Sequence, residues 1–204
     1  MDKTWQQADG IRLLRYGSYE AYRDHQVSKL ATLDLRQHSI KFKAALASRL
    51  EFLSTLPRGA TVLCLGARDG SECEVFAERG LFAVGIDLNP GRDNKRVLPG
   101  DFHEVQFADA TADVIYTNAL DHVFNFAKAM DEIKRVLKPE GIFIAEIVRG
   151  SKDHDGREPG AFESAWWDHV DSVVAGIQRH GFALRQRTRF SYPYNGDQCL
   201  FAPS

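Results

Sequence analysis

The sequence of 204 residues is poor in cysteine, with Cys64, Cys73 and Cys199 as its three thiols. Their spacing matches neither a disulfide framework nor a metal-binding pattern, and no Cys/His/carboxylate cluster has ligand spacing. We therefore expect no metal site. We interpret Cys64 and Cys73 as buried or partly buried thiols in a reducing compartment.

Long apolar runs and an excess of one charge are also missing. No stretch approaches the ~20 apolar residues of a membrane-spanning helix, and residues 1–7 contain no apolar signal region. The 26 Lys and Arg residues against 28 Asp and Glu residues give a net charge of −2, which argues against a large nucleic-acid footprint. These absences predict a cytoplasmic protein that binds neither membrane nor nucleic acid.

The composition is that of an ordinary globular protein. Hydrophobic residues make up 44% and charged residues 26% of a chain long enough for one domain with a sizeable core. Periodicity divides residues 1–204 into a helical N-terminal cap over 1–57 and a core over 58–204. We expect a single domain.

The most informative segment runs from Thr61 to Glu72 (TVLCLGARDGSE) and is followed by Gly85-Ile86-Asp87-Leu88-Asn89. A short apolar run, typical of a buried parallel strand, breaks at a glycine loop before a helix. A second apolar run ends at Asp87, 21 residues after Gly66. This layout is that of a nucleotide-binding βαβ unit, in which the acid receives ribose hydroxyls.

The loop argues against a phosphate-bearing nucleotide. A dinucleotide fingerprint requires G-x-G-x-x-G, but Arg68 and Ser71 occupy its second and third glycine positions. A P-loop requires G-x-x-x-x-G-K-[ST], which is absent. A cofactor with a ribose and no phosphate fits better, and a nicotinamide oxidoreductase is disfavoured.

The segment from Gly66 to Gly70 resembles the first motif of class I S-adenosylmethionine-dependent methyltransferases. Further segments resemble that family in the right order, over about residues 60–148. By this resemblance Asp87 binds both ribose hydroxyls, Asp101 receives the adenine amino group and Phe102 touches the ring. The remaining matching segments are 107–109 with 112–118, 119–123, and 133–143.

Two positions depart from the family pattern: Cys64 replaces its usual acid, and Arg68 its middle glycine. Arg68 either pairs with the cofactor's carboxylate or points to solvent from a loop free of left-handed backbone. If it points away, recognition of the methionine end falls to backbone amides and Glu72. Glu72 could instead simply favour the helix N-terminus electrostatically.

The predicted fold is α/β: a doubly wound, Rossmann-like sheet with helices on both faces. The resemblance implies seven strands, mostly parallel, ending in an antiparallel C-terminal hairpin. Predicted strands cover 61–66, 82–87, 95–98, 113–118, 142–148, 182–192 and 198–202, with the hairpin turn at Asn195-Gly196. Predicted helices cover 39–55, with Ile40, Ala44, Leu46, Leu50 and Leu53 on its apolar face, and 70–79, 124–137 and 163–180.

Ligands in such sheets bind at the carboxyl ends of the strands. Tyr16, Tyr19, Tyr22, His25 and Gln26 also recur at helical spacing, either as a lid over the cofactor or as an aromatic packing face. The candidate residues for binding S-adenosylmethionine are therefore Gly66, Ala67, Arg68, Gly70, Asp87, Leu88, Asp101, Phe102, Asn118, Tyr22 and Gln26.

Methyl transfer needs an aligned acceptor, excluded water and, for a hydroxyl acceptor, a base. His122 is the best base by position, because it follows a strand end and its ordinary pKa suits proton transfer near neutrality. Asp121 either orients it or acts itself, and His154 is a weaker candidate. The alternative is that His122 caps or packs the next helix.

The acceptor is the least defined feature. Little sequence is inserted beyond the core, which favours a small polar molecule, sugar-like or amino-acid-like. Trp166, Trp167, Tyr192 and Tyr194 are candidates for its pocket or for the core. Arg185, Arg187 and Arg189 alternate along one strand, as a solvated face or a homodimer contact. The alternative function is a non-catalytic protein that binds the cofactor or a related nucleoside as a partner or regulator.

Overall fold

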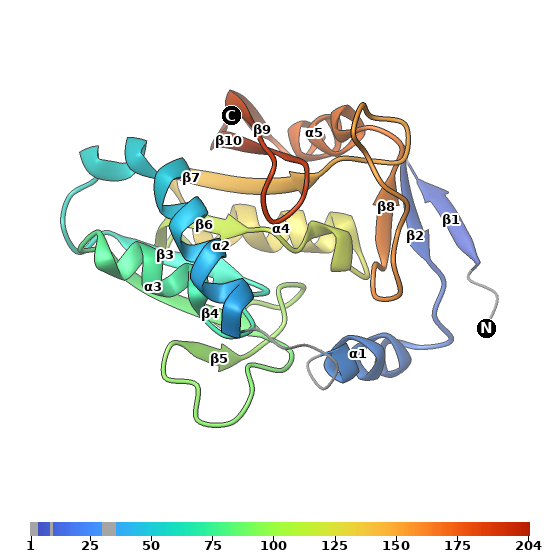
Figure 1. Ribbon diagram of the computed structural model, residues 1–204, viewed down its shortest axis with the longest axis horizontal. Coiled ribbons are helices and arrows are strands. Elements are labelled where there is room, and N and C mark those ends of the chain that lie inside the picture. Colours follow the sequence, from blue (N-terminus) through green and yellow to red (C-terminus); the bar gives the residue numbers. More distant parts are fainter. Residues whose placement is uncertain (1–3, 9, 30–35) are drawn as a thin grey trace.

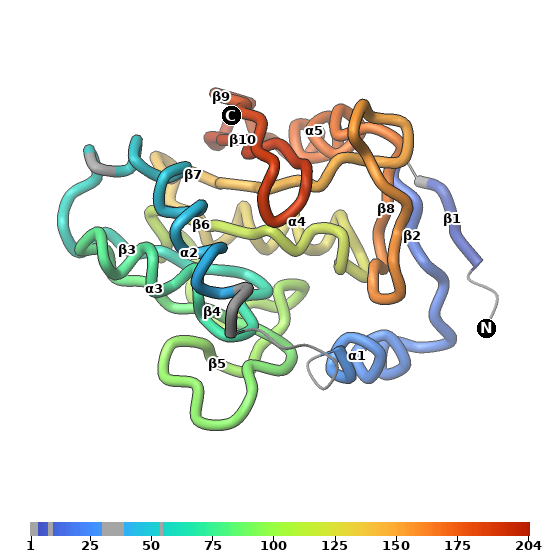
Figure 2. Tube along the Cα trace, in the orientation of Figure 1, coloured from blue at the N-terminus to red at the C-terminus, as the bar shows by residue number. Residues whose placement is uncertain are grey.

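The computed structural model describes residues 4–8, 10–29 and 36–204 (Figure 1). The N-terminal strands lie at one end of the molecule, and the chain passes from them through α1 to α2 (Figure 2). The elements follow in the order β1 (Trp5–Ala8), β2 (Ile11–Leu14), α1 (Tyr19–Ser28), α2 (Arg36–Arg49), η2 (Glu51–Thr55), β3 (Thr61–Leu65), α3 (Ser71–Glu78), β4 (Phe82–Asp87), β5 (Val97–Pro99), β6 (Ala112–Thr117), η3 (Leu120–His122), α4 (Phe126–Val136), β7 (Leu137–Val148), β8 (Ala165–Trp167), α5 (Val170–Arg179), β9 (Phe182–Phe190) and β10 (Gly196–Pro203).

The central sheet has seven strands in the order β5-β4-β3-β6-β7-β10-β9. The first five are parallel, and β10 pairs antiparallel with both β7 and β9. Residues 62–65 of β3 are all buried, as expected of a parallel strand covered on both faces. The predicted doubly wound α/β fold with a C-terminal antiparallel hairpin is confirmed.

Helices cover both faces of this sheet. On one face α2 and α3 bury Phe42, Leu46 and Phe76 against Val62 and Val114. On the other face α4 and α5 contribute a second cluster, with members Met130, Ile133, Val173, Ile177, Ile115 and Phe143. Among the described residues, no helix is long and apolar enough to cross a membrane.

The prediction that residues 1–57 form a helical cap is wrong for its first part; residues 1–3, 9 and 30–35 of that range lie outside the described residues. β1 and β2 pair antiparallel, and β2 also pairs with β8, in the register Ile11↔Trp167 and Leu13↔Ala165. The predicted helix over 163–180 therefore begins only at Val170, because residues 165–167 are extended to complete this three-stranded sheet. Trp166 and Trp167 are fully buried core residues and do not form a pocket wall.

Two local predictions also need correction. The helix predicted over 39–55 is divided into α2 and η2. Its buried face contains Phe42, Leu46 and Leu50, whereas Ile40, predicted on the apolar face, is 68% exposed. The hairpin turn occupies residues 191–195, and Gly196 already lies in β10 opposite Phe190. A side chain at Gly196 would meet the Phe190 ring at 2.5 Å, so this glycine serves close strand packing.

A buried ion pair joins α2 to the sheet. The Arg49 guanidinium donates to both carboxylate oxygens of Glu146 at 2.7 and 2.9 Å and to the carbonyl of Tyr192 at 3.0 Å. The Glu146 side chain is fully buried and also accepts from Gln198 at 2.9 Å. Breaking the pair would leave a buried carboxylate without its counter-charge.

We expect Arg49→Ala to lower the free energy of unfolding by about 3–5 kcal/mol, because it strands the Glu146 carboxylate in the core. Arg189, which is exposed on β9, provides the matched control. Arg189→Ala should change stability by less than about 0.5 kcal/mol in the same urea titrations. Equal effects of the two substitutions would contradict the importance of the pair.

Candidate functional site

The loop after β3 brings three strand ends together. Gly66 has φ +72°, and a Cβ there would lie 2.6 Å from Ala119 Cβ beyond β6, so only glycine allows this approach. Arg68 and Gly70 also have positive φ, +41° and +83°. The loop is therefore not free of left-handed backbone, and Arg68 adopts a conformation that usually requires glycine.

Asp87, at the end of β4, holds this loop in place through a hydrogen bond to its backbone. Its Oδ2 accepts the backbone N–H of Arg68 at 2.9 Å, and its Oδ1 accepts the N–H of Asn89 at 2.8 Å. Each carboxylate oxygen can accept a further hydrogen bond.

A first cavity, of about 50 Å³, opens beside Asp87. It brings together predicted site residues from the strand ends and from α1: Gly66, Arg68, Asp87, Leu88, Phe102, His122, Tyr22 and Gln26. Of the other candidates, Ala67 is buried and Gly70 is the N-cap of α3, and neither lines the cavity. The predicted residues thus converge from five separate segments.

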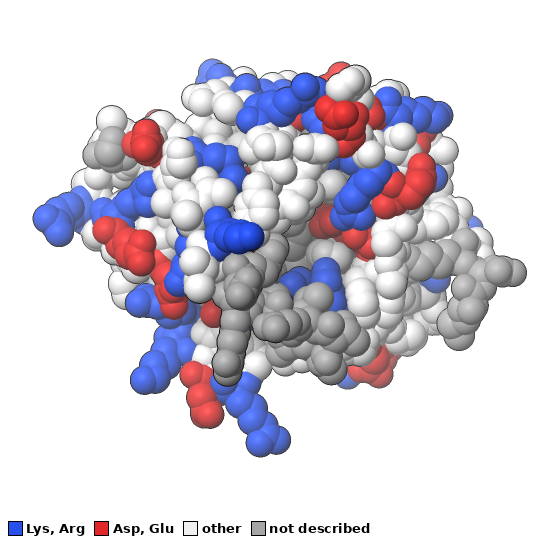
Figure 3. Space-filling view, viewed as in Figure 1, with Lys and Arg blue, Asp and Glu red and all other residues white. Residues whose placement is uncertain are grey.

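A second cavity, of about 280 Å³, shares Gly66, Arg68, Lys29 and His122 with the first. Asn118 and Asp121 line it, as do Glu72, Phe42, Arg157, Glu163 and Tyr194. Figure 3 shows a hollow near the centre of this face, with both acidic and basic residues around it. The two cavities form adjoining compartments around the end of β3.

Asp101 is placed differently from its neighbour Phe102. It lines an adjoining groove with Tyr19 and Phe124. Its Oδ1 accepts from the backbone and the ring Nδ1 of His103 at 2.8 and 2.7 Å, and Tyr19 donates its hydroxyl to Oδ2. The carboxylate is therefore engaged within the protein.

Helix α1 lies against the first cavity and is tied to the segment before β8. Buried Tyr22 donates its hydroxyl to the carbonyl of His122 at 2.9 Å. Gln26 Nε2 donates to the Phe162 carbonyl and to Ser164 Oγ, both at 2.8 Å. Tyr16 and Tyr22 also meet edge to face, so these side chains serve both as cavity lining and as packing.

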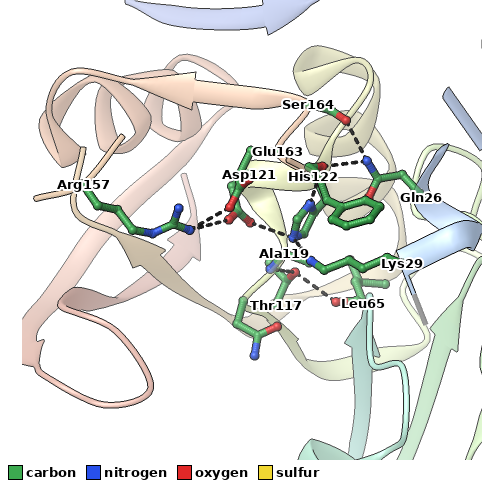
Figure 4. Close-up of polar contacts among 12 residues, drawn as sticks. Gln26, Lys29, Leu65, Thr117, Ala119, Asp121, His122, Arg157, Glu163 and Ser164 are labelled. Carbon is green, nitrogen blue, oxygen red and sulfur yellow. Dashed lines mark hydrogen bonds and ion pairs between the residues drawn. The ribbon is translucent and has the colours of Figure 1, made fainter. Parts of the chain in front are cut away.

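His122 lies at the junction of the two cavities (Figure 4). Its Nδ1 is 3.0 Å from the Phe162 carbonyl, which can only accept, so Nδ1 carries the proton. Its Nε2 is 2.7 Å from Lys29 Nζ and accepts from that ammonium. The imidazole is therefore neutral, and its lone pair is directed at Lys29.

Electrostatics agree with this assignment. Burial lowers the pKa of His122; Asp121 opposes the shift and Lys29 adds to it. Burial also lowers the pKa of Lys29 to about 8, with the Arg68 charge adding to the effect. Near neutral pH the pair therefore carries its charge on Lys29.

Sequence reasoning missed three members of this cluster: Lys29, Arg157 and Glu163. Arg157 donates to Glu163 at 2.8 Å and lies 3.8 Å from Asp121 (Figure 4). Its guanidinium also stacks on the Trp166 ring. Residues 149–161 form a polar segment, and no spacing in it pairs residue 157 with residue 121. The predicted candidate His154 is 80% exposed and pairs with Asp155 outside both cavities.

Residues 63–145 match the family model described as a methyltransferase domain. A dimethylglycine N-methyltransferase of Parasynechococcus marenigrum is 31% identical over 111 residues, which cover 47% of this chain and 40% of that protein. An uncharacterized methyltransferase of a Mycobacterium species is 28% identical over 52% of this chain and 46% of its own length. The chain therefore spans less than half the length of these curated relatives.

Solved structures share the fold over nearly the whole chain. A 1,6-didemethyltoxoflavin N1-methyltransferase of Burkholderia thailandensis, solved with S-adenosylhomocysteine bound, superposes with a TM-score of 0.74 at 16% identity and covers 98% of this chain and 99% of its own. An S-adenosylmethionine-dependent methyltransferase of Aquifex aeolicus has a TM-score of 0.65 at 17% identity, covering 85% and 96%. At such identities the likeness concerns the fold.

NMR titration of the histidine rings tests the Lys29–His122 contact. We expect Lys29→Met to raise the pKa of His122, because it removes the ammonium that disfavours a second positive charge. Lys41→Met, at an exposed position of α2, should leave that pKa unchanged. An unaltered His122 titration in the Lys29 variant would contradict the contact.

Proposed function

We propose that this chain, a member of the class I S-adenosylmethionine-dependent methyltransferases, transfers a methyl group from S-adenosylmethionine to an oxygen or nitrogen of a small polar molecule. Membership rests on the domain match over residues 63–145 and on the shared fold. The activity is supported above all by the two adjoining cavities, which share Gly66, Arg68 and His122. The first compartment suits the nucleoside part of the cofactor, and the second suits the acceptor.

The residues of the first cavity fit the nucleoside part of the cofactor. Asp87 has accepting capacity for two ribose hydroxyls, and Leu88 and Phe102 offer apolar surface to the adenine. Arg68 would pair with the carboxylate of the methionine end. Asp101 Oδ2 accepts the hydroxyl of Tyr19 and has capacity for one further bond, from the adenine amino group.

We further propose that α1 is the lid of this compartment. The cavity of about 50 Å³ is much smaller than the roughly 300 Å³ or more of a small-molecule site. Tyr22, Gln26 and Lys29 of the α1 segment line it, so their displacement would make room. Their return would exclude water from the reacting groups.

The protein itself has to supply few chemical steps. S-adenosylmethionine, when bound, supplies a methyl group already activated for displacement. The protein must align the acceptor with it and, for a hydroxyl acceptor, remove a proton. His122 can accept that proton at Nε2 once Lys29 turns away, and Asp121, with its Oδ1 3.7 Å from Nε2, can stabilise the resulting imidazolium.

The second cavity suits a small polar acceptor. Its volume of about 280 Å³ and its mixture of acidic, basic and aromatic side chains favour a sugar-like or amino-acid-like molecule over a macromolecule. A relative acts, by its name, on dimethylglycine, and a structural neighbour was solved with 1,6-didemethyltoxoflavin bound. Both names describe small molecules.

The cofactor assignment is tested by calorimetric titration with S-adenosylhomocysteine. Asp87→Asn should weaken binding by roughly tenfold or more, because it removes the charge that strengthens bonds from the ribose hydroxyls. Asp93→Asn is the matched control, since Asp93 is exposed on the next loop. Equal affinity of both variants and the unaltered protein would exclude Asp87 as the ribose acid.

The catalytic assignment is tested with labelled S-adenosylmethionine and a panel of sugars and amino-acid derivatives. On an acceptor so identified, His122→Asn should lower kcat/KM by about 10²–10⁴ if a proton must be removed, while affinity for S-adenosylhomocysteine is kept. His154→Asn should retain full activity. Tight cofactor binding without transfer to any compound would instead favour the non-catalytic alternative.

A further inference from the structure

Glu72, the second residue of α3, is an unusual acid. It is 7% exposed, so it is not the solvent-facing charge expected at a helix N-terminus. Its Oε1 accepts from the side-chain amide of Asn118 at 3.2 Å. Its Oε2 is buried and has no hydrogen-bond partner among the described residues, although the side chain lines the second cavity.

A buried carboxyl oxygen without a partner is costly and rare in folded proteins. Arg68, Asp69, Tyr116 and Cys64 interact electrostatically with the Glu72 carboxyl group, but none of them hydrogen-bonds to Oε2. Across the cavity are Lys29, Asp121, His122, Arg157 and Glu163. The arrangement is that of a receptor for a hydrogen-bond donor supplied by a ligand.

We propose that Glu72 and Asn118 form the seat of an ammonium group, that of the amino-acid end of the cofactor. This inference rests on the proposed function. Arg68 and Glu72 are four residues apart in the sequence and both line the second cavity, so a cation and an acid flank one compartment. A zwitterionic amino-acid group presents the complementary pair of charges. In this chain Glu72 supplies the acid that Cys64 cannot.

The protonation of Glu72 gives the seat a measurable signature. Burial raises its pKa to about 8 and Asp69 adds to the shift, while the backbone N–H of Glu72 itself, Arg68 and Asn118 oppose it. The acid is therefore mostly neutral at pH 7, whereas a bound ammonium favours the carboxylate. Binding should release close to one proton at pH 7, and affinity should increase as the pH rises from about 6 to 8.

The experiment is calorimetric titration in buffers of different ionisation enthalpy. The probes are S-adenosylhomocysteine and 5′-methylthioadenosine, which shares the nucleoside thioether but lacks the amino-acid group. Glu72→Gln should weaken S-adenosylhomocysteine binding by roughly 10- to 100-fold and abolish the proton release and the pH dependence. Its affinity for 5′-methylthioadenosine should be unchanged, which also shows that the variant is folded.

Glu74→Gln is the matched control, because Glu74 lies on the same helix turn but is partly exposed and pairs with Lys43 at 2.7 Å. It should bind both probes like the unaltered protein. Unchanged S-adenosylhomocysteine affinity and proton release in Glu72→Gln would overturn the inference. If Glu72→Gln instead raised only the KM of an amine acceptor, the seat would belong to the acceptor and the assignment to the cofactor would be wrong.

If the unaltered protein bound neither probe, the proposed function would fail, and the seat with it. If it bound both probes with a dependence on Asp87 but none on Glu72, the cofactor site would stand and only the seat would be overturned.

Discussion

The close approach of three strand ends is the constraint on which the whole site depends. Gly66 leaves room for Ala119 after β6, and Gly85 in β4 leaves room for Ala67, where a Cβ would meet another at 2.6 Å. Asp87 then fastens the loops by accepting N–H groups from Arg68 and Asn89. Because these contacts are made by backbone and very short side chains, they fix the positions of the longer groups around them.

A second layer of order comes from polar contacts between remote segments. Lys29 donates to His122, and Arg157 pairs with Glu163 near Asp121. Glu163 is buried, so its carboxylate would be costly to leave without Arg157, and the segments that carry these contacts are held in mutual register. Helix α1 and residues 157–164 are thereby coupled to the end of β6, although they are distant in sequence. A ligand that separates Lys29 from His122 would loosen this coupling.

The parts of the fold that could be predicted from the sequence are those specified by short-range pattern. The strand, glycine loop and second strand with its terminal acid around Gly66 and Asp87 form one continuous unit with its own periodicity, and its burial follows from that pattern. The extended state of Ala165–Trp167 has no such local cause, because it comes from pairing with β2 across most of the chain. For the same reason Lys29 and Arg157 were missed: polar contacts between remote segments leave no spacing to recognise.

The pairing of β2 with β8 has a consequence for the order of events during synthesis. Ile11 leaves the ribosome 156 residues before its partner Trp167. Until then the outer strand pair lacks its third strand, and Gln26 lacks the carbonyl of Phe162 to which it donates. Such long-range closure is slow to form and follows the local elements. Nascent chains should therefore build the α3-bearing half first and complete the compartment beside α1 last.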